Sequence, residues 1–169
     1  MRWLVGDIQG CAREFDTLLR EIRYDPGHDE LWCLGDLVNR GPDSLAVVRT
    51  WRDIGGHGLI GNHEVHALLA HSGRKPKDLP DLATLFAAPD ADDLMDALRS
   101  LPVLVHLPSA GDGPDVWAVH AGLDPRWTDL HGKAAELNAG PHDDDRLLRD
   151  DVAYAVHVRC CTPDGARTR

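Results

Sequence analysis

Short apolar runs that each stop near a glycine constrain the fold of this sequence most. They read RWLV at residues 2–5, LWCL at 31–34 and HGLI at 57–60, and each is short enough to be a buried strand. Between them, residues 13–23 and 44–54 place apolar side chains at helical spacing, and a further helix is expected over 64–71. This alternation predicts an α/β fold with a largely parallel sheet.

The second half of the chain follows a less regular pattern. Helices are expected over 81–87 and 90–100, and PVLVHL (102–107) and DVWAVH (115–120) are expected to pair as a hairpin through PSAGDG. Residues 124–151 are polar and helix-capable. The run VAYAVHVRCC (152–161) is interpreted as a last strand before a TPDG turn, and the chain stops at Arg169, where a hairpin partner would be expected.

Length and composition favour one soluble globular domain over residues 1–169. There is no apolar run of about 18 residues that would span a membrane, and no secretion signal at the start. Four cysteines without metal-knuckle spacing fit reduced thiols in a cytoplasmic protein. The net charge of −10 argues against binding to duplex DNA, whereas it leaves a phosphate substrate open, since metal-binding carboxylates are themselves acidic.

Polar side chains follow the three predicted strands in nearly the same way. The motifs are GDIQG at 6–10, GDLVNRG at 35–41 and GNHE at 61–64, and His120 ends a later strand before Ala-Gly. Loops after parallel strands gather at one edge of a sheet, so Asp7, Asp36, Asn62 and His63 are expected to converge there. A lone Gly-Asp is usually a turn, but four such strand ends together indicate a site. The remaining histidines, except His157, are interpreted as surface or helix-face residues: His28, His57, His66, His71, His106, His131 and His142.

The residue types at these strand ends favour a pair of divalent metals. Oxygen and imidazole ligands without thiolate suit Mn, Co, Fe or Zn. A carboxylate such as Asp36 can bridge two ions about 3.5–4 Å apart, an arrangement that recurs in phosphatases. Arg40 would then clamp a phosphate through its planar guanidinium, and His63 would protonate the departing oxygen.

Taken in order, these motifs resemble the calcineurin-type metallophosphoesterases of the phosphoprotein-phosphatase branch. Within that branch the chain is similar to the bacterial symmetrical bis(5′-nucleosyl)-tetraphosphatases. The resemblance rests on GDIQGC, DELWCLGDLVNRGPDSL, GNHEVHALLA, KPKD, LFAAPDADDLMDALRSLPVL and VHAGLDPRW, within residues 2–127, and VRCCTPDG is similar to a later stretch of the same family.

The resemblance implies a four-layer α-β-β-α fold around two divalent metal ions. It implies that Asp7 and Asp36 bind the first ion, that Asp36 bridges, and that Asn62 and His120 bind the second. Gln9 stands where the wider superfamily usually has a histidine ligand, although glutamine is familiar there in the tetraphosphatases. As a neutral and weaker ligand, Gln9 would hold the first ion loosely or through water.

The resemblance also implies the reaction. Diadenosine tetraphosphate would be hydrolysed at its centre to two molecules of ADP, with Arg40 on the phosphate and His63 as the general acid. Arg159, within VRCCTPDG, is a further candidate for substrate binding. Nucleoside-tetraphosphate caps at RNA 5′ ends are a second substrate class that the resemblance implies.

The chain departs from the family pattern at several positions. Asn39 replaces the aspartate that polarises the catalytic histidine in protein phosphatases, and Glu64 is usual in those enzymes, where tetraphosphatases often carry aspartate. The family's further Gly-His motif, beyond the TPDG turn, is absent, and no glycine precedes His157. We therefore expect an incomplete second metal shell, through truncation or through loss in the lineage.

Two alternatives stay open on sequence alone. A protein serine/threonine phosphatase is favoured by Glu64, but disfavoured by Ala121 after His120 and by the pattern over residues 75–102. The other alternative is a non-catalytic remnant that binds nucleotide or a partner, which the missing Gly-His motif favours.

Overall fold

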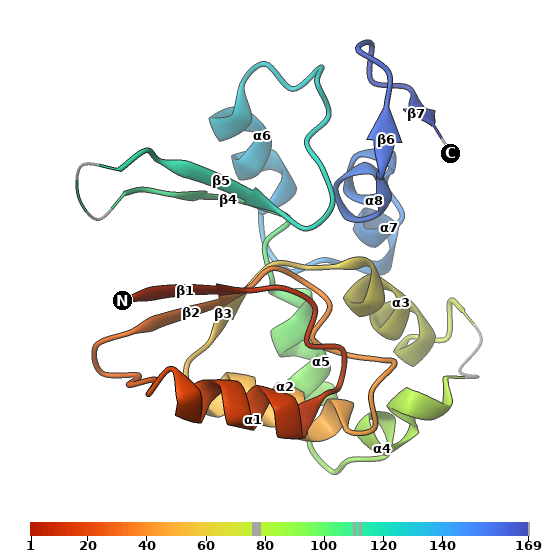
Figure 1. The fold of residues 1–169 in the computed structure, drawn as a ribbon. Helices are drawn as coiled ribbons and strands as arrows, with labels where there is room; N and C mark the ends of the chain where they lie inside the picture. The colour runs from red at the N-terminus through yellow and green to blue at the C-terminus, as the bar shows by residue number, and fades with distance from the viewer. Residues whose placement is uncertain (76–78, 110, 112, 169) are drawn as a thin grey trace.

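The computed structural model describes residues 1–75, 79–109, 111 and 113–168. Figure 1 shows its helices and strands, coloured along the chain. In chain order the elements are β1 (Arg2–Val5), α1 (Ala12–Glu21), β2 (Glu30–Cys33), α2 (Ser44–Asp53), β3 (His57–Gly58), α3 (Asn62–His71), η1 (Pro80–Leu82), α4 (Ala83–Phe86), α5 (Ala91–Arg99), β4 (Leu104–Leu107), β5 (Val116–Val119), α6 (Leu130–Leu137), α7 (Asp144–Leu147), α8 (Asp150–His157), β6 (Cys160–Cys161) and β7 (Arg167–Thr168).

The first three strands form a parallel sheet in the order β1-β2-β3. Val5 of β1 pairs with Cys33 of β2, which in turn pairs with Gly58 of β3. The strands therefore end at the same edge, as the sequence predicts. Strands β4 and β5 pair antiparallel, Leu104 opposite Val119, which confirms the predicted hairpin strands. The turn between them includes residues 110 and 112, which lie outside the described part of the chain, as does most of the KPKD motif.

The elements stack in four layers. Helices α1 and α2 lie against one face of the β1-β2-β3 sheet, where Phe15 of α1 joins the same buried cluster as Leu31 of β2. The β4-β5 hairpin covers the other face through Leu59, Leu107 and Ala118. Helix α6 packs behind β4 (Figure 1). The α/β fold with an α-β-β-α arrangement is thus confirmed, with a second sheet of two strands. A single domain over the whole chain stays a prediction.

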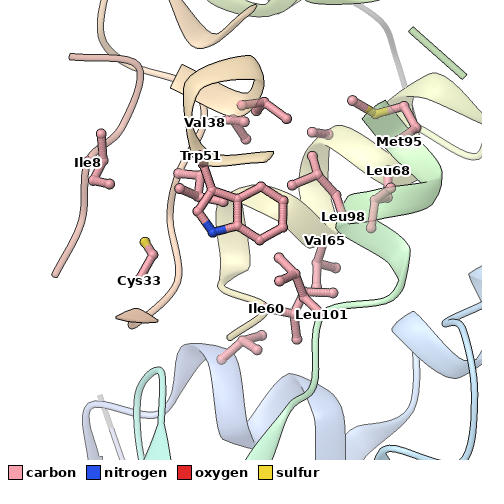
Figure 2. Packing of buried hydrophobic residues seen from close by; sticks show 14 of the residues in the cluster. Ile8, Cys33, Val38, Trp51, Ile60, Val65, Leu68, Met95, Leu98 and Leu101 are labelled. Carbon is pink, nitrogen blue, oxygen red and sulfur yellow. The ribbon is translucent and has the colours of Figure 1, made fainter. Parts of the chain in front are cut away.

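The main core lies between the sheet and the helices that follow it (Figure 2). Trp51 of α2, Val65 and Leu68 of α3 and Leu98 of α5 pack together there. The Trp51 indole donates a hydrogen bond from Nε1 to the carbonyl oxygen of His57 at 3.0 Å, so a polar group is buried at little cost. This packing fixes α3, and with it the polar residues at the start of α3.

One secondary-structure prediction is wrong. Residues 150–157 form helix α8, where VAYAVHVRCC was expected to be a strand. Val152, Ala155 and Val156 are buried at the i, i+3, i+4 spacing of a helix, and Asp150 and Asp151 in the first turn suit its dipole. The apparent alternation arose because small alanines separate the larger side chains. The hairpin partner expected after the TPDG turn is present as β7.

Within the described ranges, none of the helices combines the length and apolarity needed to cross a membrane.

Candidate active site

The loops after β1 and β2 bring two carboxylates and an amide together. The Gln9 amide nitrogen Nε2 lies 3.3 Å from Asp7 Oδ2 and 3.5 Å from Asp36 Oδ2. Asp7 is exposed, whereas Asp36 is buried, with 3% of its surface accessible. The predicted convergence of these three residues is therefore found in the structure. Because amide oxygen and nitrogen are assigned by hydrogen bonding, a rotated Gln9 amide offers Oε1 to the same space.

Backbone hydrogen bonds lock these two loops to each other. The Gln9 N–H donates to the Asp36 carbonyl at 2.7 Å, the Gly10 N–H to Leu37 at 2.8 Å, and the Gly41 N–H to Gln9 at 2.7 Å. Gln9 and Asp36 both adopt positive φ angles, +48° and +59°, which side chains other than glycine rarely do. Such strain persists only where surrounding contacts hold it, and it concentrates at functional sites.

A buried carboxylate beneath the loops holds them in place. Glu64, in the first turn of α3, accepts hydrogen bonds at Oε2 from the N–H groups of Asp36 (2.7 Å) and Gly61 (2.9 Å). Its Oε1 accepts from Leu37 at 2.7 Å and Val38 at 3.3 Å. Burial and the charge of Asp36 raise the pKa of Glu64 to about 7, against these donors, which favour the ionised form. Nothing in the sequence around Glu64 indicates this role, because its four donors are set by how two loops meet.

The other oxygen of Asp36 faces α3 and the end of β5. Asp36 Oδ1 accepts the His63 N–H at 3.0 Å and lies 3.5 Å from His120 Nε2. Asn62 Oδ1 lies 3.2 Å from the same Nε2. Asp36 thus has Asp7 and Gln9 beside one oxygen, and Asn62 and His120 beside the other.

The tautomer of His120 makes this second group suitable for a cation. His120 Nδ1 lies 2.8 Å from the Leu34 carbonyl oxygen, which can only accept, so Nδ1 carries a proton. In the neutral ring, Nε2 then presents a lone pair toward Asn62 Oδ1 and Asp36 Oδ1. A positive ion bound among these three atoms would satisfy all of them together. A carbonyl on the outer nitrogen is also the usual way a metal-binding histidine is oriented.

Two glycines make room for this arrangement. A Cβ on Gly61 would lie 2.3 Å from Asp36 Oδ1, and one on Gly35, which has φ of +99°, would lie 2.4 Å from His120 Nδ1. A side chain at Gly61 would displace the Asp36 carboxylate, and one at Gly35 would displace the His120 imidazole. The glycines before the Asp36 and Asn62 motifs are therefore required by space as well as by the turn.

His63 lies at the centre of the site but without an orienting partner. Its side chain is buried, and Nε2 lies 3.7 Å from Asp36 Oδ2. Among the described residues, no group bonds to the buried Nδ1. Asn39, the expected counterpart of the polarising aspartate, instead accepts the Arg40 N–H through its side-chain oxygen at 3.0 Å. His63 Nε2 therefore lies near the Asp36 carboxylate, whereas Nδ1 has no hydrogen-bond partner in the described part of the chain.

The two arginines predicted to bind phosphate are both exposed. Arg40 has a φ of +69° and an exposed side chain, and Arg159 is exposed between α8 and β6; neither forms an ion pair with any described residue. Burial lowers the pKa of His157, with contributions from Lys75 and Arg167, while the charge of Asp36 raises it. His157 therefore lies within electrostatic reach of Asp36. Arg40 and Arg159 stay candidates for phosphate binding.

The donor set fits divalent metal ions only if amides take part. Within the described part of the chain, no three His, Cys, Asp or Glu side chains are arranged to hold a metal. Gln9 and Asn62 complete the two groups around Asp36, and the lone pair of His120 points into one of them. Oxygen donors with one imidazole, and no thiolate, suit Mn, Co, Fe or Zn. The residues around Asp36 therefore fit divalent metal ions.

The remaining histidines have structural surroundings, with one correction. His28 and His106 pair with Asp25 at 2.8 Å and with Asp115 at 3.0 Å, and His57 stacks on Trp32. His142 was expected at the surface, but it is buried, with its Nε2 3.0 Å from the Leu101 carbonyl. Its position between α5 and α7 is set by packing that the local sequence does not reveal.

Comparison with known proteins shows which family the chain is similar to. Residues 2–165 match the family model described as Calcineurin-like phosphoesterase. The chain is 44% identical over 130 residues to a symmetrical bis(5′-nucleosyl)-tetraphosphatase of Shewanella sp. (strain MR-7), covering 75% of this chain and 46% of that protein. It is 43% identical over 128 residues to the protein of the same name from Nitrosococcus oceani, covering 74% and 45%.

The fold is also similar to that of a solved structure. A crystal structure described, provisionally, as a diadenosine tetraphosphatase superposes with a TM-score of 0.61 at 35% identity, covering 74% of this chain and 51% of that one. The chain spans about half the length of the curated relatives it matches.

Proposed function

We propose that this chain, which belongs to the calcineurin-like phosphoesterase family, hydrolyses dinucleoside tetraphosphates symmetrically with the help of two divalent metal ions. Diadenosine tetraphosphate would give two molecules of ADP. The position of Asp36 supports this most directly, because its two oxygens face two separate groups of ligand atoms. The similarity to two proteins named as symmetrical bis(5′-nucleosyl)-tetraphosphatases supports the choice of substrate.

The proposed metal ligands divide between the two oxygens of Asp36. Asp7 and Gln9 would hold one ion on the Oδ2 side, and Asn62 and His120 the other on the Oδ1 side. Mn, Co, Fe or Zn would supply positive charge to the phosphoryl oxygens and would lower the pKa of the attacking water.

The chain's own side chains would bind the substrate and move a proton. Arg40, exposed and without an ion pair in the described part of the chain, would bind a phosphoryl group through two N–H donors. His63 would donate a proton from Nε2 to the departing phosphate oxygen. Its Nδ1 has no partner among the described residues, so Nε2, which lies 3.7 Å from Asp36 Oδ2, is the nitrogen from which the imidazolium would give its proton.

Hydrolysis of diadenosine tetraphosphate with Mn²⁺ or Co²⁺ tests this function. We expect ADP as the sole nucleotide product, and a loss of about 100-fold or more in rate for His63→Ala and Asp36→Asn. His28→Ala, in an exposed loop, is the matched control and should retain full activity. A cooperative urea transition for each variant shows that it is folded. Absence of metal-dependent ADP from the folded chain would contradict the proposal, and ATP with AMP would contradict symmetrical cleavage.

The same assay separates the other candidates. A phosphoserine peptide tests the protein phosphatase alternative, and RNA with a nucleoside-tetraphosphate cap tests the second proposed substrate class. Saturable ADP binding without turnover would identify a nucleotide-binding remnant. The proposal includes a cytoplasmic setting, where the four free cysteines stay reduced.

A further inference from the structure

A cavity on the α8 side of the candidate active site has no part in the proposed chemistry. It has a volume of about 430 Å³, within the range of roughly 300–1,000 Å³ typical of small-molecule sites. Its lining includes Asp124, Arg126, Trp127, Tyr154, Gly165 and Arg167. These residues come from the loop after β5, from helix α8 and from the TPDG turn, which the proposed hydrolysis leaves without a role.

The cavity has an aromatic wall. The rings of Trp127 and Tyr154 lie with centroids 6.2 Å apart, at an angle of 54°. The Lys133 ammonium lies 5.4 Å from the Trp127 centroid and supports that ring. Gly165, also in the lining, lies close against Asp124, since a Cβ there would lie 2.7 Å from Asp124 Oδ1. Tyr154 is only 4% exposed and backs the partly exposed Trp127 indole, which is the ring on which a nucleobase would stack.

Some of the charged residues that line the cavity form ion pairs with described residues, and others do not. Asp124 is buried and bonded to Arg126, and Asp151 lies 2.7 Å from the Lys133 ammonium. In the described part of the chain, Asp150 and Arg167 are the lining residues of either sign that form no ion pair. Asp150 can accept hydrogen bonds from a ribose or an amino group, and Arg167 can bind a phosphate. A larger cavity of about 640 Å³ offers no unpaired arginine among its described lining residues, because Arg74 already pairs with Asp145 and Arg99 with Asp144.

The cavity adjoins the His120 side of the active site. Asp124, in its wall, follows His120 by four residues. The N–H of Ala121, next to His120, donates to the carbonyl oxygen of Ala155, next to Tyr154, at 2.8 Å and fixes the end of β5 against α8.

We propose that this cavity binds the nucleoside of one half of the dinucleotide substrate. The base lies against Trp127, and Arg167 binds the phosphate next to the ribose, on the path toward Asp36. This inference rests on the proposed function and names the residues that would distinguish a nucleotide from a simple phosphate ester.

Calorimetric titrations with adenosine, ADP and inorganic pyrophosphate test the inference. Trp127→Leu should weaken binding of adenosine and ADP by about tenfold, because base stacking on an aromatic ring is lost, and should leave pyrophosphate unchanged. Arg167→Ala should weaken ADP by about tenfold, through loss of a charged hydrogen bond, and should leave adenosine unchanged. Trp117→Leu, at a partly buried tryptophan of β5, and Arg52→Ala, at the end of α2, are matched controls expected to bind all three probes normally.

The outcomes are distinguishable from those of the activity assay. If Trp127→Leu lacks a cooperative urea transition, Trp127→Phe replaces it, with a smaller loss of adenosine affinity expected. Equal adenosine affinity in wild type and the folded Trp127 variant would overturn the inference, as would the absence of saturable adenosine binding to wild type. Neither readout requires turnover, so adenosine binding that depends on Trp127 in an inactive chain would contradict the proposed hydrolysis and uphold the subsite. An active chain whose adenosine binding does not depend on Trp127 would uphold the proposed hydrolysis and contradict the subsite.

Discussion

Glu64 shows how a single residue can organise a site without touching substrate. Its carboxylate accepts four backbone N–H groups, from three consecutive residues after β2 and from Gly61 before α3. The positions of Asp36 and Asn62 therefore depend on one buried side chain. Buried N–H groups without an acceptor cost free energy, so this carboxylate stabilises both loops together.

We expect Glu64→Gln to lower the free energy of unfolding by about 3 kcal/mol. Each oxygen of Glu64 accepts two N–H groups, so an amide in either orientation sets its own NH₂ against two donors. Urea unfolding measures the change. Glu14→Gln, at an exposed position of α1, is the control and should change stability by less than about 0.5 kcal/mol. A Glu64→Gln variant as stable as wild type would show that the loops are held by other contacts.

Gly61 and Gly6 form a matched pair for testing space in the site. A Cβ at Gly61 would lie 2.3 Å from Asp36 Oδ1, whereas nothing lies within 4 Å of one at Gly6. Gly61→Ala should therefore lower the free energy of unfolding by about 2 kcal/mol or more, through overpacking, and Gly6→Ala by less than about 0.5 kcal/mol. Thermal or urea unfolding measures both. Equal losses would indicate a backbone effect instead.

At the scale of residues, the sequence predicts which side chains form the site better than it predicts the hydrogen bonds that hold them. Asp7, Gln9, Asp36, Asn62, His63 and His120 were all expected at one edge of a sheet, and the structure brings them together. The role of Glu64 could not be predicted, because its four partners are defined by how two loops cross. The burial of His142 likewise depends on contacts distant in the chain.

At the scale of elements, an ion-pair cluster joins α6 to α8. Asp151 of α8 lies 2.7 Å from the Lys133 ammonium of α6 and 2.6 Å from an Arg149 guanidinium nitrogen. Burial raises the pKa of Asp151, but these cations outweigh it and lower the pKa to about 2. Asp151 also lines the proposed nucleoside cavity, so the cluster holds one of its walls.

The stability of this cluster should depend on pH. A carboxyl with a depressed pKa in the folded state stabilises the fold above its unfolded pKa and loses that contribution as pH falls through the folded value. The free energy of unfolding should thus decline between about pH 5 and pH 2, by about 1–2 kcal/mol from this residue. Asp151→Asn should remove that part of the slope in urea titrations, whereas Asp96→Asn, at an exposed position of α5, should not. An unchanged slope in Asp151→Asn would contradict the assignment.

Elements with a strong local signal were predicted well, and α8 was not. The amphipathic spacing of α1 and α2 was sufficient to place both within two residues of their ends. In α8 the run Val-Ala-Tyr-Ala-Val alternates in size, so period two and the helical period fit equally well over so few residues. Packing of Val152, Ala155 and Val156 against the core decides for the helix.

At the scale of the whole molecule, Cys33 reports on the integrity of the sheet. It lies on the central strand β2, is fully buried, and burial raises the pKa of its thiol. Cys160 and Cys161 are exposed. A disulfide reagent should therefore modify Cys160 and Cys161 rapidly in the native protein and Cys33 only on unfolding. Mass spectrometry after timed labelling measures this, with a urea-unfolded sample as the reference. Rapid native modification of Cys33 would mean that β2 is accessible.

The overall fold could be predicted from the sequence because its local signals agree with one another. Strand ends, glycines and helix periods all favoured one parallel sheet, and the match over residues 2–165 confirms the family. The pairing of the second sheet was predicted as well, whereas its position against the first sheet was not, since that position is set by packing on Leu59.

The hydrogen bonds between the loop after β1 and the loop after β2 make them behave as one mechanical body. Gln9, Gly10 and Gly41 exchange backbone bonds with the partner loop, and Glu64 joins α3 to the same body. His120 is attached to it by one bond to Leu34 and by its contact with Asn62. The side chains on both sides of Asp36 are thus held in place by the fold itself, so a substitution that loosens one loop would disturb the ligand atoms of the others as well.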